Sequence, residues 1–180
     1  MKERIFVTYA LRSLAITVFT LAATFSLPLR AHLMVAQHGT LNLVDNGVYI
    51  VLSVPVSSLT GIKNNADGTM SKQEFIRNKA DIISTFKRQV TLSDETGNRP
   101  LQGVMISPAN DHHDDEANIA QIILMGRYLL ADDNENLIFD IGLYGKSAHE
   151  RQYQLSFTNK AMRKKMTFSL SPDKRVAQLF

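Results

Sequence analysis

The amino-acid sequence predicts a mainly β protein, an antiparallel immunoglobulin-like sandwich of about eight strands with one inserted EF-hand-like loop and α-helix. Three observations support this class. Apolar residues alternate in short runs, turn-forming residues separate those runs, and one segment has the spacing of an amphipathic helix instead. With 180 residues and 44% hydrophobic content, the chain can bury a substantial core as one domain.

The first 31 residues have the parts of an export signal. Lys2, Arg4 and Arg12 form a basic start, an apolar stretch follows over residues 14–29, and Ala31 stands at the expected cleavage point. We therefore expect residues 1–31 to be a signal peptide and residues 32–180 to be a single periplasmic domain. The alternative is an uncleaved membrane anchor, for which the apolar stretch is short against the ~20 residues of a spanning helix.

The basic excess of the chain lies mostly in this leader. Residues 1–31 hold four of the 20 basic residues and one of the 17 acidic residues, which leaves 16 of each in residues 32–180. A neutral domain lacks the basic surface that nucleic acid requires, so we expect no nucleic-acid partner. The expected partner is a protein of unknown identity in the periplasm or at the membrane. The absence of cysteine excludes disulfides, thiolate metal sites and a cysteine nucleophile.

The first two strands are predicted to form a hairpin. GTLNLV precedes a turn at Asp45, Asn46 and Gly47, and an alternating apolar run follows in GVYIVLSVPVSS. Pro55 has no amide hydrogen for a ladder, so this strand should end, bulge or lie at an edge there. Six further runs are predicted as strands: QVTLSD, PLQGVMIS, NIAQIILMGRYLL, NLIFDIGLYG, RQYQLSFT and KKMTFSLS.

One α-helix is predicted over residues 71–88, because its apolar residues fall on one helical face. Ser71 is the expected N-cap, and Glu74 three residues later completes a capping box. The same residues fit a second interpretation, because residues 63–74, KNNADGTMSKQE, match a 12-residue EF-hand-type loop. The candidate calcium ligands in that frame are Asn65, Asp67, Thr69, Ser71 and Glu74, at positions 3, 5, 7, 9 and 12.

Two further residues fit the loop and one does not. Gly68 stands at position 6, where the sharp turn needs glycine, and Met70 stands at the apolar position 8. Lys63 stands at position 1, where an aspartate normally binds the ion. With two carboxylates and this lysine, calcium binding should be weak, at ~10⁻³ M, or vestigial. Lys63 is then expected to pair with Asp67 or Glu74 as a built-in counterion.

A family resemblance extends over essentially all of residues 32–180. AHLMVAQHGTLNLVDNGVYIVLSVPVSSLTGI, the loop and helix that follow, and then PLQGVMIS and NIAQIILMGRYLL resemble an uncharacterised family of exported proteobacterial proteins with an EF-hand-like loop. The resemblance implies a small β-rich exported protein that binds calcium, and it supplies no catalytic residues. Lys63 departs from the family's loop, which carries several aspartates.

Two other functions remain as alternatives. Cleavage after Ala31 would leave His32 as the first residue, whose amine and imidazole can chelate copper with help from His38, His112 or His113. The segment NDHHDDE, residues 110–116, is predicted to be a solvated loop rather than a metal site. The second alternative is a periplasmic hydrolase that sequence motifs do not reveal. Because no GxSxG, HExxH or phosphate-loop motif occurs, we expect a non-enzymatic binding or structural module.

Overall fold

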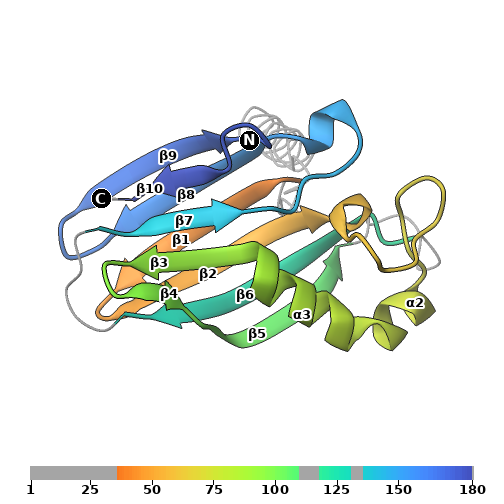
Figure 1. The fold of residues 1–180 in the computed structure, drawn as a ribbon, viewed down its shortest axis with the longest axis horizontal. Coiled ribbons are helices and arrows are strands. Elements are labelled where there is room, and N and C mark those ends of the chain that lie inside the picture. The colour runs from red at the N-terminus through yellow and green to blue at the C-terminus, as the bar shows by residue number, and fades with distance from the viewer. Residues whose placement is uncertain (1–35, 110–117, 131–135, 180) are drawn as a thin grey trace, which may run out of the picture. The chain divides into compact units, whose positions relative to one another are not determined.

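The computed structural model describes residues 36–109, 118–130 and 136–179, which all lie in the unit of residues 33–180. Two β-sheets form this unit, and they pack face to face with short helices at one side (Figure 1). The predicted β-sandwich class is therefore confirmed. The described residues form ten strands, against the eight or so that the sequence predicts.

The larger sheet has six strands in the order β5-β6-β2-β1-β8-β9. The first strand, β1, pairs in parallel with β8, and all other pairs in this sheet are antiparallel. The strands correspond to six of the predicted runs, which confirms those predictions. Their bounds are β1 (His38–Val44), β2 (Gly47–Pro55), β5 (Leu101–Ala109), β6 (Gln121–Leu129), β8 (Tyr153–Asn159) and β9 (Lys164–Leu170).

The smaller sheet has four strands in the order β10-β7-β3-β4, and all of its pairs are antiparallel. The predicted strands β3 (Val90–Asp94) and β7 (Ile138–Ile141) form its centre. Its two edges, β4 (Gly97–Arg99) and β10 (Val176–Gln178), have three residues each and are not among the predicted strands. The smaller sheet is thus both narrower and shorter than the larger one.

The β1–β2 hairpin has the predicted strands and the predicted end. Asp45 and Asn46 make the turn, with Asp45 in the left-handed region at φ 50°, and Gly47 is already the first residue of β2. Pro55 pairs opposite Gln121 as the last residue of β2. The chain then turns through the 3₁₀ helix η1 (Val56–Ser58), so the expected end of the strand at Pro55 is confirmed.

The predicted single helix over residues 71–88 is wrong in one respect, because the structure divides it. Helix α2 (Lys72–Arg77) ends at Asn78, and α3 (Lys79–Gln89) begins directly after it. Asn78 leaves helical geometry at φ −95° and ψ 9°, and its side-chain amide donates to the Glu74 carbonyl at 2.8 Å. A second 3₁₀ helix is η2 (Ala148–Glu150). Among the described residues, no helix has the length and apolar content that a membrane span requires.

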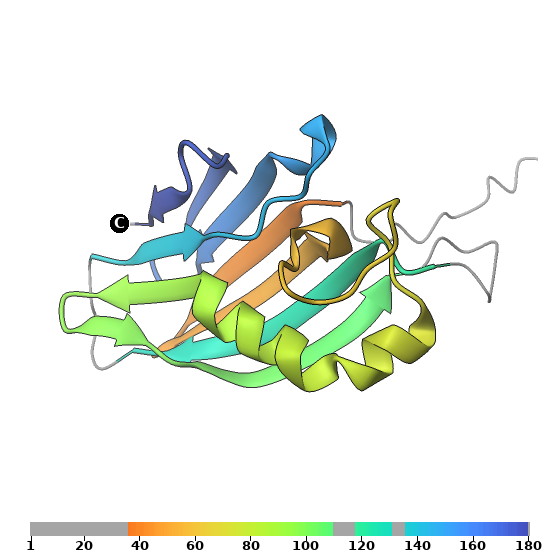
Figure 2. The same ribbon diagram turned by 45° about the vertical axis from the view of Figure 1, so that its right-hand side comes forward.

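The core lies between the larger sheet and a mixed second layer. The inward residues of β2, Val48, Ile50, Leu52 and Val54, are at most 2% exposed. Ile82 and Phe86 of α3 belong to the same core, together with Phe75 of α2. Figure 2 shows α3 continuing the layer of the smaller sheet across the inner face of the larger one. The helix therefore covers apolar surface that the four short strands leave open.

Two buried tyrosines tie segments together through hydrogen bonds. The hydroxyl of Tyr128 on β6 donates to the Val90 carbonyl on β3 at 2.9 Å, which links the two sheets. The hydroxyl of Tyr153 on β8 donates to the Leu143 carbonyl at 2.8 Å. Burial raises the pKa of Tyr128 and of Tyr153, so each hydroxyl keeps its proton and remains a donor.

Asp94 closes the β3–β4 turn with its carboxylate. The guanidinium of Arg99 donates to this carboxylate, and so do the amide and hydroxyl of Thr96 at 2.9 and 2.8 Å. These hydrogen bonds, that of Arg99 above all, lower the pKa of Asp94 to about 2. The folded state therefore favours the ionised carboxylate more strongly than the unfolded state does.

This depressed pKa predicts a loss of stability in acid. The contribution of Asp94 is present above its unfolded pKa of about 3.9 and is lost as the pH falls toward 2. As the pH falls from the unfolded pKa toward 2, we expect the free energy of unfolding of wild type, measured in urea, to fall by up to about 1 kcal/mol more than that of Asp94→Asn. This figure allows for screening by solvent. Equal losses in both proteins would contradict the assignment.

Candidate functional site

Met70 is the point at which the EF-hand-like loop joins the sandwich. Its amide donates to the Ile119 carbonyl at 3.0 Å, and the Ile119 amide donates back to the Met70 carbonyl at 2.7 Å. Both side chains are 0% exposed and belong to the main core. Ile119 lies just before β6 in the larger sheet. The apolar position 8 of the loop is therefore fixed to the sandwich by backbone and side chain together.

Three of the five candidate calcium ligands lie together before this anchor. The Asp67 carboxylate accepts from the Thr69 hydroxyl at 2.7 Å and from the Thr69 amide at 3.0 Å. The Asn65 side-chain amide donates to the Thr69 hydroxyl at 3.1 Å. The hydrogen bonds from Thr69 hold the pKa of Asp67 below its usual value. Asn65 and Asp67 are exposed and Thr69 is half-buried, and the side-chain oxygens of Asp67 and Thr69 already take part in these hydrogen bonds.

The other two candidate ligands, Ser71 and Glu74, form the predicted capping box. The Ser71 hydroxyl accepts from the Glu74 amide at 3.2 Å, while Oε2 of Glu74 accepts from the Ser71 amide and hydroxyl, both at 3.0 Å. These bonds lower the pKa of Glu74, chiefly the one from the Ser71 amide. A calcium ion at this loop has to compete with Ser71 for that carboxylate oxygen.

Lys63 is exposed at position 1 of the loop, near enough to act on Glu74. Its positive charge contributes to the lowered pKa of Glu74, in the same direction as Arg77 and as the hydrogen bonds from Ser71. This influence of Lys63 on the pKa of Glu74 is smaller than that of the hydrogen bonds from Ser71, and the pairing of Lys63 with Asp67 or Glu74 stays a prediction. The site therefore has an internal cation in the region where the EF-hand frame expects a ligand carboxylate.

Gly68 has two reasons to be glycine. It adopts φ +83°, the left-handed geometry that the sharp turn of the loop requires. A Cβ at this position would also lie 3.0 Å from the Cβ of Ser57 in η1. The first reason was predicted from the EF-hand spacing. The second follows only from the fold, because the loop packs on a helix that precedes it in the chain.

A second capping box lies beside the loop and was not predicted. Oε2 of Glu150 accepts from the Ser147 hydroxyl at 2.6 Å and from the Ser57 hydroxyl at 2.8 Å. Partial burial opposes ionisation, yet the hydrogen bonds from Ser147 and Ser57 lower the pKa of Glu150. SAHE at residues 147–150 has the same S-x-x-E pattern as SKQE at residues 71–74, so this box could have been found from the sequence.

Only one of the four candidate copper ligands lies in the described part of the chain. His38 is exposed at the start of β1, with Nδ1 at 2.9 Å from the Ala36 carbonyl oxygen. His32, His112 and His113 lie outside the described residues, as does the rest of NDHHDDE. The copper interpretation stays a prediction.

One serine, histidine and carboxylate do come together, but their order does not match a nucleophilic triad. The Ser147 hydroxyl lies 3.3 Å from Nε2 of His149 and also donates to Glu150. A triad needs the histidine between the serine and the carboxylate, so that the imidazole is oriented as a base. Here the serine stands between the other two, as the capping box requires.

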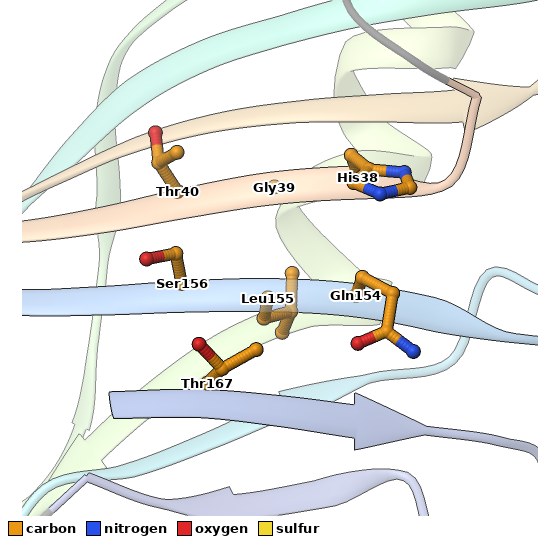
Figure 3. Close-up of a pocket in the computed structure, with 7 residues that line it drawn as sticks. All are labelled: His38, Gly39, Thr40, Gln154, Leu155, Ser156 and Thr167. Carbon is orange, nitrogen blue, oxygen red and sulfur yellow. The ribbon is translucent and has the colours of Figure 1, made fainter. Parts of the chain in front are cut away.

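The larger sheet also carries a shallow depression on its outward side. It has a volume of about 450 Å³ and lies across β1, β8 and β9. Figure 3 shows the hydroxyl groups of Thr40, Ser156 and Thr167 along it. The residues that line the depression are His38, Gly39, Thr40, Gln154, Leu155, Ser156 and Thr167. Apart from His38, none of these residues is a candidate from the sequence.

No protein-family model matches this chain, and no curated protein does so. Within the described ranges, no group of three or more histidine, cysteine or acidic side chains is placed to hold a metal. A cation at the EF-hand-like loop would therefore depend on two carboxylates, Asp67 and Glu74, supplemented by amide, hydroxyl and backbone oxygens.

Because Met70 anchors the loop, we expect truncation of its side chain to cause a large loss of stability. Met70→Ala should lower the free energy of unfolding by about 2–4 kcal/mol, because the side chain is 0% exposed and leaves a cavity. Ile76→Ala is the matched control, since Ile76 lies six residues on in α2 and is 65% exposed. Urea denaturation measures both, and similar small losses would show that Met70 is not the anchor.

Proposed function

We propose that this chain is an exported, non-enzymatic binding and structural module whose EF-hand-like loop fastens α2 and α3 to the sandwich, with weak calcium binding as added support. The observation that carries the proposal is the double backbone contact between Met70 and Ile119. This contact holds the loop at Met70, which occupies the apolar position 8. That position is also buried in an EF-hand. Export is inferred from the basic and apolar parts of residues 1–31.

The hydrogen bonds of the loop support a structural role that does not require metal. Asp67 is satisfied by Thr69, and Glu74 is satisfied by Ser71. Calcium would have to displace some of these donors and to overcome the charge of Lys63. Ligand charge sets the affinity of such loops, so a dissociation constant of ~10⁻³ M is the expected scale.

Thermal melting with and without calcium tests this proposal. At 10 mM calcium, a site with a dissociation constant of ~1 mM adds about 1.4 kcal/mol, which should raise the melting midpoint of the purified chain by about 3–5 °C over its value in EDTA. Glu74→Gln should lose this rise, since glutamine removes the charge but can still complete a capping box. Lys63→Asp should enlarge the rise.

Asp173→Asn is the control for general charge effects, because Asp173 is an exposed acid outside the loop. It should respond to calcium as wild type does. If calcium leaves the melting midpoint of wild type unchanged and raises only that of Lys63→Asp, the natural chain does not bind calcium. The loop is then a purely structural remnant. If calcium raises the melting midpoints of Glu74→Gln and wild type equally, calcium binds outside this loop.

A further inference from the structure

The outer face of the larger sheet is the surface opposite the core, and its residues follow from the register. Because successive residues of a strand point to opposite sides, the neighbours of each buried residue point outward. Two rows of outward residues cross all six strands, from β5 to β9. One row is Gln102, Arg127, Tyr49, Asn42, Thr158 and Lys165, and the next is Met105, Met125, Val51, Thr40, Ser156 and Thr167.

This outer face has a one-sided charge. The six strands, within the bounds that the structure gives them, contain no aspartate or glutamate. The first row contains Arg127 on β6 and Lys165 on β9, both exposed. Four strand spacings of about 4.8 Å separate these two cations, so they lie about 19 Å apart along the row. The face is therefore suited to a ligand with widely spaced negative charges.

Tyr49 supplies an aromatic surface in the middle of the same row. Its ring lies over Gly47, where a Cβ would come within 3.2 Å of the ring carbon Cε2. The glycine thus makes room for the ring to lie along its own strand, and the side chain remains 45% exposed. Arg127 and Asn42 are its cross-strand neighbours. A ring held in this way offers a stacking platform with a cation on one side and an amide on the other.

The remaining polar groups of the outer face are mostly hydroxyls and amides. Thr40, Ser156 and Thr167 line the depression between β1, β8 and β9, and Gln154 lies at its end (Figure 3). Such groups donate and accept hydrogen bonds without carrying charge. They match a ligand that is itself rich in hydroxyls more closely than one that is densely charged.

We propose that the outer face binds an extended acidic polysaccharide, with one sugar ring stacked on Tyr49 and an acidic group of the chain at Arg127. The glycan runs across the strands toward the hydroxyl-lined depression and Lys165. A second copy that packs through this same face does not suit it, because Arg127 and Lys165 would meet a sheet whose six strands contain no aspartate or glutamate. Binding of this kind uses none of the loop residues and is independent of calcium.

Two other macromolecules fit the observations less well. Nucleic acid carries a phosphate on every nucleotide and is held by dense sets of lysine and arginine, whereas the row has two cations far apart. An extended peptide commonly gains its affinity by adding to a sheet edge, where backbone groups are open. On the outer face, the backbone groups of the inner strands are already paired within the sheet.

Affinity electrophoresis of the full chain tests the proposal. Hyaluronan, which carries a carboxylate on every second sugar, should retard wild type in EDTA, and neutral dextran and single-stranded oligothymidine should retard it far less. Tyr49→Ala and Arg127→Gln should each weaken hyaluronan binding by about tenfold or more, as central contacts of an interface do. Ile76→Ala and Lys79→Gln are matched controls, since both residues are exposed on the helices.

Two substitutions of Thr167 test the depression separately from the stacking residue Tyr49. Thr167→Glu introduces a carboxylate at an exposed position and should abolish most of the binding, whereas Thr167→Gln has nearly the same size and should retain it. Thermal melts establish that each variant is folded. The proposal is overturned if hyaluronan leaves wild type unretarded, if oligothymidine binds more tightly, or if Thr167→Glu and Thr167→Gln bind equally.

Discussion

The fold depends on covering one wide apolar surface. The inner face of the six-stranded sheet is lined by fully buried side chains of β2, β6 and β8, while the opposing sheet has four strands, two of them only three residues long. Burial of apolar area is the main favourable term in folding, so the uncovered part of this face must find another partner. Helix α3 supplies it with Ile82 and Phe86. The insertion between β2 and β3 is thus a structural requirement of the larger sheet.

This requirement explains why the EF-hand-like loop has its present form. The loop must bring the chain from η1 to the start of a helix at a fixed distance from the sheet. Met70 pairs with the sandwich, Gly68 allows close packing on η1, and the capping box begins the helix. The same oxygens that could bind an ion therefore already have structural partners. A cation can add to such a loop but is not needed to shape it, which is consistent with a lysine at position 1.

Sequence pattern was informative where a feature repeats or is local. Eight strands follow from period-two alternation, the end of β2 follows from Pro55, and the Ser71–Glu74 box follows from its spacing. The three-residue strands β4 and β10 are too short to show a period, and the break at Asn78 has neither glycine nor proline to mark it. The Ser57–Glu150 contact and the rows of the outer face join distant segments, so they become visible only once the register is known.

The parallel pairing of β1 with β8 has a consequence for how the protein reaches its folded state. His38 at the start of the described chain pairs with Gln154 near its other end, so the larger sheet cannot close until almost the whole chain is present. Pairings between distant segments slow folding, because the entropy of closing a long loop must be lost first. We therefore expect the larger sheet to be completed late in synthesis, after the residues of β8 have been made.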